Sequence, residues 1–170
     1  MVEVERFAQG RNLQTSFVII DSKGIKNTDT AENKGYDAGK KISGIKLHLA
    51  VDILGLPQAI HITKAGVTDR NGAIEMILLN LKNLPCVKNM LVDSGYSGEN
   101  FANAIKNIHG STVEKSDLHK FQVIPKRWIV ERTFAWLEKN RRLWKNCERK
   151  LHTSLQMTSL ALFSLILKRF

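Results

Sequence analysis

The sequence predicts an α/β fold in which a mixed β-sheet is covered by helices. Three observations lead to this prediction: β-rich runs come first, helical periods separate the later runs, and the last third of the chain is helical. Of the 170 residues, 43% are hydrophobic and 25% are charged, which is typical of a soluble globular protein with a real core. Antiparallel strands followed by β–α crossovers produce a mixed sheet that helices cover.

The first half of the chain predicts three strands. Residues 17–21 form a short β-rich run, and the polar, glycine-containing stretch after them predicts a long loop. Residues 44–63 show apolar alternation on both sides of "LGLP", which predicts two strands joined by a tight turn. These two strands are expected to pair antiparallel.

The second half alternates helices with strands. Residues 73–84 have helical spacing, with Asp69 placed to cap or precede the first turn. Residues 88–98 predict a strand that ends in an acid and a glycine-rich turn, and residues 99–108 predict the next helix. The ribonuclease-H-like fold has this order of elements, and other mixed sheets share it too.

The last third of the chain ends in helices. Residues 109–120 have the weakest pattern, and residues 120–126 predict a last strand closed by Pro125. The apolar run at 155–167 has thirteen residues, whereas a membrane span takes about twenty. It predicts a C-terminal helix packed on the domain and no membrane partner.

Positive charge is concentrated in the C-terminal third. Lys and Arg minus Asp and Glu give 13 − 12 = +1 for residues 1–114 and 13 − 4 = +9 for residues 115–170. Such clustering favours a polyanion, either nucleic acid or an anionic membrane surface, although solvated charge alone is an alternative. Cys86 and Cys147 form no disulfide or zinc pattern, and the first residues do not resemble a secretory signal, so a cytoplasmic protein is expected.

Two aspartates stand at the carboxyl ends of predicted strands. Asp21 and Asp93 each end an apolar run and are each followed by serine. Ligands of open α/β sheets gather beyond these strand ends, so the two acids can face one ligand if their strands are neighbours. Carboxylate oxygens suit Mg²⁺, and two ions about 3.5–4 Å apart can activate an attacking oxygen and stabilise a leaving one.

A third acid, Glu131, lies in the basic stretch "RWIVERTFAWLEKNRR" at 127–142. At 100° per residue, Val130, Phe134, Leu137 and Trp144 fall on the stripe expected to face the sheet, and Glu131 lies at its border. A carboxylate there can join the two aspartates. The alternative is a surface pair between Arg127 and Glu131 at i,i+4 spacing.

The motifs that carry a family resemblance are "IIDSKGIK", "KGYDAGKKISGIKLHLAVDILGLP", "LVDSGYSG" and "RWIVERTFAWLEKNRRL". From about residue 15 to the end, the chain resembles the DDE transposases of bacterial insertion sequences, in particular the insertion sequence 5 family. The resemblance implies a ribonuclease-H-like fold, the catalytic and metal-binding acids Asp21, Asp93 and Glu131, and two Mg²⁺ or Mn²⁺ ions. The expected organisation is an N-terminal extension (1–14), a catalytic domain (15–150) and a C-terminal helix packed on it (151–170).

The chain departs from the family's Tyr-x2-Arg-x3-Glu-x6-Lys signature at two positions. Arg127 and Glu131 match, but Ile124 stands where the tyrosine would be and Glu138 where the lysine would be. Lys139 is one residue away and points in another direction on a helix. The DNA contact that the signature implies for its lysine is therefore not carried over.

Several basic and aromatic residues are expected to contact DNA. Lys46 and His48 share one strand face and resemble the family's Lys-x-His element, with an exposed polar face as the alternative. Tyr96 can stack on an unpaired base or pack in the core. Backbone contacts are expected from the cations around Glu131, namely Arg127, Arg132, Lys139, Arg141, Arg142 and Lys145.

Other acids and the tryptophans have structural interpretations. Asp52 can replace Asp21 as the first acid, but it lies in a hairpin where a turn-forming acid is ordinary. Asp37 and Asp29 are expected to be solvated in a loop. Trp128, Trp136 and Trp144 recur every eight residues, which favours core packing over base stacking.

The predicted function is that of a transposase catalytic domain that cuts transposon ends and joins them to target DNA. In this family an upstream helix-turn-helix segment, often joined by frameshifting, reads the ends, and a homo-oligomer is expected on double-stranded DNA at the nucleoid. The alternatives are an inactive transposase remnant that binds DNA non-specifically and a ribonuclease-H-like nuclease without strand transfer.

Overall fold

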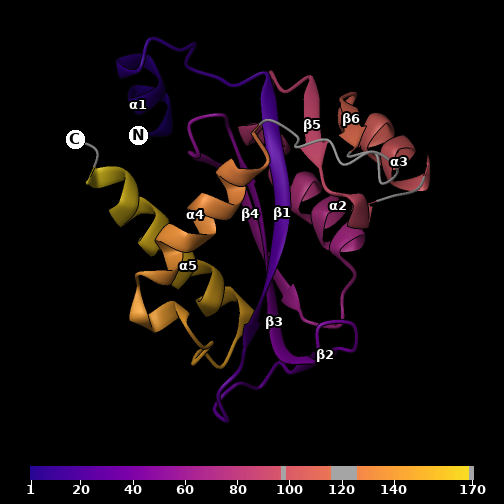
Figure 1. Cartoon of the computed structure of the whole chain (residues 1–170), viewed down its shortest axis with the longest axis vertical. Helices are drawn as coiled ribbons and strands as arrows, with labels where there is room; N and C mark the ends of the chain where they lie inside the picture. The colour runs from indigo at the N-terminus through magenta and orange to yellow at the C-terminus, as the bar shows by residue number, and fades with distance from the viewer. Residues whose placement is uncertain (97–98, 116–125, 169–170) are drawn as a thin grey trace.

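The fold is seen in a computed structural model that describes residues 1–96, 99–115 and 126–168. A six-stranded sheet stands in the middle with helices on both faces (Figure 1). The strands are β1 (Phe17–Lys26), β2 (Gly35–Asp37), β3 (Ile42–Val51), β4 (Pro57–Lys64), β5 (Asn89–Val92) and β6 (Thr112–Lys115). The helices are α1 (Val2–Ala8), α2 (Asp69–Leu79), α3 (Glu99–His109), α4 (Trp128–Glu138) and α5 (Leu151–Leu167). The predicted α/β class is confirmed.

The sheet is antiparallel at one side and parallel at the other. β3 pairs antiparallel with β1 and with β4, as the "LGLP" hairpin predicts. β1 pairs parallel with β5, and β5 pairs parallel with β6. The short strand β2 pairs with the beginning of β3. The two central strands are therefore β3 and β1, and the parallel neighbour of β1 is the strand that leads to Asp93.

Strand alternation divides the core into two layers. Val18 and Ile20 of β1 pack against α2 and α3, whereas Ile19 packs against α4 and α5. Figure 1 shows these two pairs of helices on opposite faces of the sheet. Both layers are made of buried hydrophobic side chains, with Met76, Ile77 and Ile105 in the first and Val130, Phe134 and Leu162 in the second.

The strand and helix boundaries differ from the prediction in three places. β1 continues to Lys26 because it pairs with β3 along that length, with Lys26 opposite Gly44. The helix α2 begins at Asp69 itself, and the hydroxyl of Thr68 is its N-terminal cap. β6 lies within residues 109–120, where parallel pairing with β5 supplies the order that the local pattern lacks. The strand expected at 120–126 lies outside the described residues except for Lys126.

The prediction that Trp144 shares the buried stripe of α4 is wrong, because α4 ends at Glu138. Trp144 is 63% exposed and Trp128 is 54% exposed, so neither belongs to the core. After the helix, a short 3-10 turn (Arg141–Leu143) leads the chain across the end of β1. The expected core stripe is correct for Val130, Phe134 and Leu137, all of which are buried.

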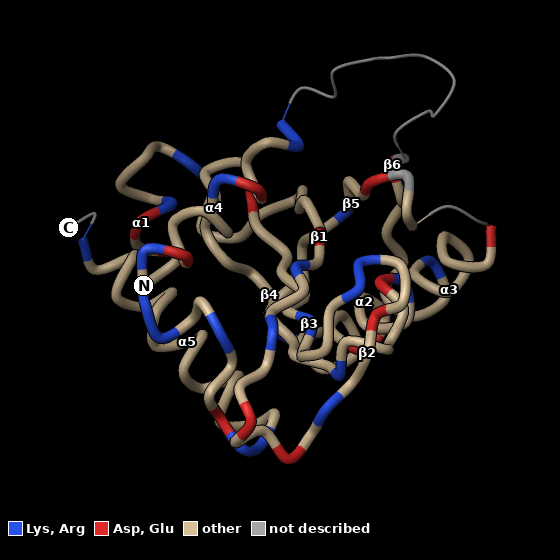
Figure 2. The backbone as a smooth tube through the Cα atoms, turned by 60° about the horizontal axis from the view of Figure 1, so that its bottom comes forward, with Lys and Arg blue, Asp and Glu red and all other residues tan. Residues whose placement is uncertain are grey.

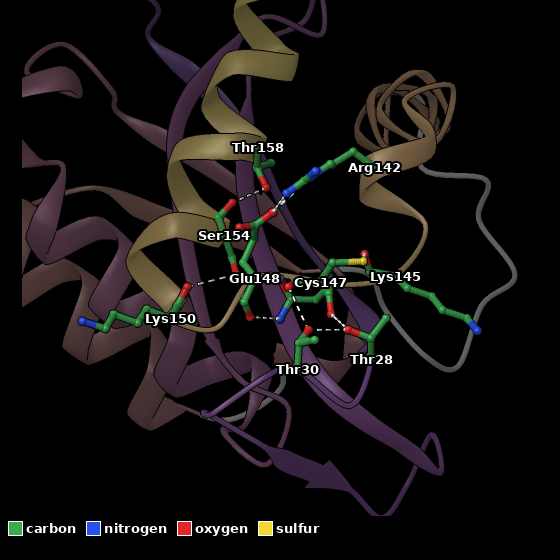
Figure 3. A network of polar contacts seen from close by, with 10 residues as sticks. Thr28, Thr30, Arg142, Lys145, Cys147, Glu148, Lys150, Ser154 and Thr158 are labelled. Carbon is green, nitrogen blue, oxygen red and sulfur yellow. Dashed lines mark hydrogen bonds and ion pairs between the residues drawn. The ribbon is translucent and has the colours of Figure 1, made fainter.

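A polar network fastens this crossing segment (Figure 3). The side chain of Asn146 donates to Asn27 Oδ1 at 2.9 Å and accepts from Ser154 Oγ at 2.7 Å. The hydroxyl of Thr30 donates to the carbonyl of Cys147 at 2.9 Å. These bonds join α5 to the loop after β1, so the chain between α4 and α5 is tied to the sheet.

The C-terminal helix α5 packs on the sheet through Ala161, Leu162 and Ile166, as expected. Among the helices of the described residues, none has both the length and the apolar character needed to cross a membrane.

Candidate active site

The two predicted aspartates lie on neighbouring parallel strands. The register of β1 and β5 places Ile19 opposite Leu91, so Asp21 and Asp93 follow two residues further along each strand. Ile19 and Leu91 both belong to the core layer under α4. Because side chains alternate along a strand, both aspartates project to that same side of the sheet. The register therefore brings the two acids near each other, but only Asp93 follows the end of its strand, because Asp21 lies within β1.

Asp21 carries an uncompensated charge. The pKa of its carboxyl is raised to about 6, chiefly by burial and to a smaller extent by the nearby charge of Asp93, although the hydrogen bond from the Ser22 amide lowers it. The Ser22 N–H donates to Asp21 Oδ1 at 2.7 Å. A carboxyl whose pKa is raised by burial and by a second acid is a frequent property of functional sites.

Arg127 connects the second aspartate with Glu131. Its Nη2 lies 3.3 Å from Asp93 Oδ2, and its Nε lies 3.7 Å from Glu131 Oε1. The charge of Arg127 also lowers the pKa of Asp21 against the effect of burial. The i,i+4 pair considered from the sequence is present, and the same guanidinium pairs with Asp93. Glu131 thus lies on the same side of the sheet as Asp21 and Asp93.

The acids present oxygen donors that suit a hard divalent cation. In the described parts of the chain, no three Asp, Glu, His or Cys side chains are gathered closely enough to share one metal ion. Instead, the Arg127 guanidinium supplies positive charge to Asp93 and Glu131. Asp93 Oδ1 accepts the Gly95 N–H at 2.6 Å, which leaves Oδ2 directed to the cation. The donor set fits a divalent cation, provided that Glu131 approaches the aspartates and Arg127 yields.

Lys46 is not on a DNA-facing surface, contrary to the expectation. Its ammonium group is buried and lies 2.8 Å from Asp69 Oδ1 and 3.1 Å from Asp37 Oδ2, and it donates to the Val67 carbonyl at 2.8 Å. Burial opposes the charge of Lys46, but the hydrogen bonds and charges of Asp69 and Asp37 raise its pKa overall. Asp37, expected to be solvated, is a partner of this buried cation.

His48 and Tyr96 are also buried, so the expectation of DNA contacts does not fit their positions. His48 bonds to the Thr63 hydroxyl at 2.9 Å, and burial lowers its pKa to about 4. A Cβ on Gly72 would lie 2.1 Å from its ring, so a side chain there would displace the histidine. Tyr96 is 1% exposed and packs beside Phe101 with 5.5 Å between ring centroids. Its packing alternative is the one that the structure describes.

The remaining predicted DNA-binding cations differ in their surroundings. Arg132 lies between the rings of Trp128 and Trp136, with its guanidinium carbon 4.6 Å from each centroid. Arg142 pairs with Glu148 at 2.8 Å, which Figure 3 shows. Lys139, Arg141 and Lys145 have exposed side chains. In Figure 2, basic and acidic positions are interleaved over the fold, with basic residues where the described chain resumes before α4.

Two lysines that lie near the acids were not identified from the sequence. Lys40 lies 3.6 Å from Asp69 Oδ2, and its charge lowers the pKa of Asp21 against burial. Lys23 follows Asp21 by two residues on the same strand face and pairs with Glu138. The alternation of β1 could have identified Lys23, whereas Lys40 is brought near by the β2–β3 hairpin.

Asp52 is not a substitute for Asp21. Its side chain is fully buried, and it pairs with Arg6 of α1. Its Oδ1 accepts the N–H groups of Leu54 and Leu56, each at 2.9 Å. It is the turn-forming acid that the hairpin interpretation predicts.

The mixed sheet and the helices that cover it define a fold of the ribonuclease-H-like class. Two solved structures share this fold with the chain. The intasome of simian T-cell lymphotropic virus, solved with the PP2A regulatory subunit B56 gamma, has a TM-score of 0.59 at 17% identity over 89% of this chain and 48% of that one. The catalytic core domain of BIV integrase has a TM-score of 0.53 at 16% identity over 88% of this chain and 82% of that one.

The chain belongs to the transposase DDE domain family, whose sequence model matches residues 12–167. A putative transposase for the insertion sequence element IS402 of Burkholderia cepacia is 30% identical over 141 residues, which cover 78% of this chain. The match covers 65% of the length of that relative. The resemblance expected from the four motifs is thereby confirmed at the level of the family.

Proposed function

We propose that this chain is the catalytic part of an insertion-sequence transposase that cuts transposon ends and joins them to target DNA. The observation that carries the proposal is that three acids from distant parts of the sequence lie on one side of the sheet around Arg127. Asp21 and Asp93 come from adjacent parallel strands, and Arg127 joins Asp93 to Glu131 of α4. Membership in the transposase DDE domain family supports it.

The chemistry proposed is phosphoryl transfer by positioning and charge stabilisation. Asp21, Asp93 and Glu131 would hold two divalent ions, Mg²⁺ or Mn²⁺. Such a pair of ions, when bound, activates the attacking water or 3′-hydroxyl and stabilises the leaving oxygen. Each aspartate is already oriented by a backbone amide on one oxygen. The Arg127 guanidinium, once its carboxylates are engaged, becomes available to a DNA phosphate.

The raised pKa of Asp21 supports the same proposal. A partly buried carboxylate that lacks sufficient positive charge favours a cation or a proton as its partner. The exposed cations around α4, Lys139, Arg141 and Lys145, would contact the DNA backbone without reading sequence. Recognition of the ends by an upstream helix-turn-helix segment, assembly of copies on double-stranded DNA and action at the nucleoid belong to this proposal.

The test is a strand-cleavage and strand-transfer assay with an Asp93→Asn variant. We expect a loss of both activities by about a hundredfold or more, since preorganised charge stabilisation is typically this large. An Asp29→Asn variant is the matched control because Asp29 is an exposed acid in the loop after β1. Wild-type joining by Asp93→Asn would refute the assignment. Cleavage without any joining in the unmodified protein would favour the nuclease alternative, and no divalent-dependent cleavage would favour the inactive remnant.

A further inference from the structure

The helix α1 lies outside the part of the chain that the family shares, yet it is anchored in the domain. The family match begins at residue 12, whereas α1 spans Val2–Ala8. Its Arg6 is buried, and its Nε donates to the carbonyls of Asn12 and Leu13 at 2.9 and 3.2 Å. The same guanidinium pairs with Asp52 through Nη1. Arg6 therefore joins α1, the link to β1, and the hairpin between β3 and β4.

Asp52 organises the β3–β4 turn (residues 52–56). Its side chain is 0% exposed, so its charge depends on Arg6 for a partner. The carboxylate oxygen Oδ1 accepts two amides of the turn, from Leu54 and Leu56. The backbone of Asp52 exchanges further bonds with Leu56 and Gly55, each 3.0 Å long. A change in the position of this carboxylate would therefore change the shape of the turn.

The outer side of the turn rests on α4. Leu54 O accepts from Arg132 Nη2 at 3.4 Å, and Gly55 O accepts from the Thr133 hydroxyl at 3.2 Å. Gly55 has φ +79°, and a Cβ on it would lie 3.0 Å from Thr133 Oγ1. Trp128 and Trp136 hold the Arg132 guanidinium from both sides. The turn thus contacts the two residues that directly follow Glu131.

Glu131 depends on these neighbours for its direction. Its side chain is 56% exposed, and its Oε1 lies 3.7 Å from the Nε of Arg127. The rotation of α4 about its axis decides whether this carboxylate faces the aspartates. Thr133 is buried, and its hydroxyl lies 3.2 Å from Gly55 O and 3.1 Å from Ile129 O, so the turn adds one contact to this rotation beside the packing of α4 on the sheet. Figure 1 shows α1, the β3–β4 turn and the beginning of α4 at one end of the molecule.

We infer that Arg6 is a positioning residue for Glu131, acting through Asp52 and the β3–β4 turn. The inference rests on the proposed function, because it concerns the placement of a catalytic acid. It assigns a role to α1 beyond that of an extension: α1 supplies the counter-charge that sets the turn, and the turn sets α4. If Arg6 only stabilised the fold, its replacement would lower the stability of the whole domain without a selective effect on α4.

The experiment is performed on the full chain with Arg6→Met and, as the matched control, Arg11→Met. Arg11 belongs to the same N-terminal segment and has an exposed side chain. For Arg6→Met we expect kcat of strand cleavage to fall about tenfold to a hundredfold, as for a misplaced catalytic group, with KM for DNA unchanged. Amide hydrogen exchange should accelerate in the turn and in α4. Unchanged exchange in α4 would overturn the inference.

A double-mutant cycle with Thr133→Val tests whether both residues act along one path. The effects of Arg6→Met and Thr133→Val on kcat should be non-additive. The second change removes the hydrogen bond between α4 and the same turn that Arg6 orders through Asp52. Additive effects would overturn the inference. Arg6→Lys retains a charge for Asp52 and should keep most of kcat; a loss equal to that of Arg6→Met would also overturn it.

Two further measurements keep the test decisive. If Arg6→Met does not fold, Asp52→Asn takes its place in the cycle, since the side-chain oxygen of asparagine can still accept the turn amides while the ion pair with Arg6 is lost. Glu131→Gln is measured in parallel. If Glu131→Gln cleaves DNA at the unmodified rate, the proposed function fails, while exchange in α4 of the Arg6 variants still reports whether the mechanical path exists.

Discussion

Two groups of acids lie on opposite faces of the same sheet and have opposite electrostatics. On the α4 face, burial raises the pKa of Asp21 to about 6. On the α2 face, the amide of Lys40 and the ammonium group of Lys46 lower the pKa of Asp37. Burial opposes the charge of Asp69, but the hydrogen bond from Lys46 lowers its pKa overall.

The difference between the two faces separates acids that are paired within the fold from the acid that we propose for catalysis. Lys46 of β3 forms ion pairs with both acids of the α2 face. Its Nζ lies 3.1 Å from Asp37 Oδ2 and 2.8 Å from Asp69 Oδ1. Asp21 has no ion-pair partner within 4 Å in the described residues, although more distant cations act on it. A buried charge with a purely structural role is normally paired with an opposite charge of the same protein. A desolvated acid that is not compensated is suited to an external cation.

The largest expected effect comes from neutralising one acid on each face. Asp21→Asn should reduce strand cleavage by about a hundredfold or more, because a charge that stabilises the reaction is lost. The same change should raise the free energy of unfolding by about 2 kcal/mol at pH 8, since a buried charge with a raised pKa is removed. Cleavage assays and denaturant unfolding without divalent ions measure the two effects.

Asp69→Asn is the matched change on the other face. It should lower the free energy of unfolding by about 1–3 kcal/mol, because Lys46 loses a charged hydrogen-bond partner. Cleavage by the folded protein should be retained. If both variants lose stability equally, the contrast between compensated and uncompensated acids is wrong.

The next effect is a pH dependence in which two groups oppose one another. The folded pKa of Asp21 is raised from 3.8 to about 6, so this carboxyl stabilises the fold as pH falls from 6 to 4. The folded pKa of His48 is lowered from 6.5 to about 4, because burial disfavours its charge. Stability from neutral His48 is therefore lost as pH falls over nearly the same range.

Removing either group should reveal the other. Each shift corresponds to about 3 kcal/mol, so the two contributions nearly cancel in the unmodified protein. In Asp21→Asn, the free energy of unfolding should fall by about 3 kcal/mol from pH 7 to 4 relative to the unmodified protein. In His48→Gln, it should instead rise as pH falls. Chemical denaturation in buffers with a chelator measures both; parallel pH profiles of all three proteins would contradict the prediction.

The sequence was sufficient to predict that Asp21 and Asp93 lie near each other, because each follows an apolar run, although β1 continues beyond Asp21. Asp21 and Asp93 end apolar runs, and the β-α order indicates that such strands can be parallel neighbours. The border position of Glu131 follows from helical periodicity, which correctly identified Val130 and Phe134 as buried. These features depend on local pattern, which a sequence contains directly.

The surroundings of Lys46 could not be predicted in the same way. Alternation correctly places Lys46 and His48 on one strand face, but a period of two does not say whether that face is covered. The cover comes from Asp69 of α2, 23 positions away, and from Asp37 of β2, which has no strong strand pattern. The course of the chain after α4 is similarly non-local, because the Asn146 N–H donates to the carbonyl of Lys26 at the end of β1.

The smallest expected effect concerns the surface ion pair on the α4 face, between Lys23 and Glu138. The two side chains are 33% and 57% exposed, so Glu138→Gln should change the free energy of unfolding by less than about 1 kcal/mol. Lys23 shares the strand face of Asp21, and freeing its charge should strengthen DNA binding. The slope of log affinity against log salt should steepen by about 0.9, as for one additional phosphate contact.

A second surface pair, between Glu32 and Arg149 at 2.7 Å, is the control for this change. Glu32→Gln alters net charge equally but frees Arg149, which lies just before α5. Fluorescence anisotropy with a short duplex over a salt series measures both variants. A steeper slope for Glu138→Gln alone would extend the DNA-facing surface from the acids along β1 to Lys23. Equal slopes would mean that the duplex responds to net charge, and that Lys23 is a structural partner of α4 like Lys46 on the opposite face.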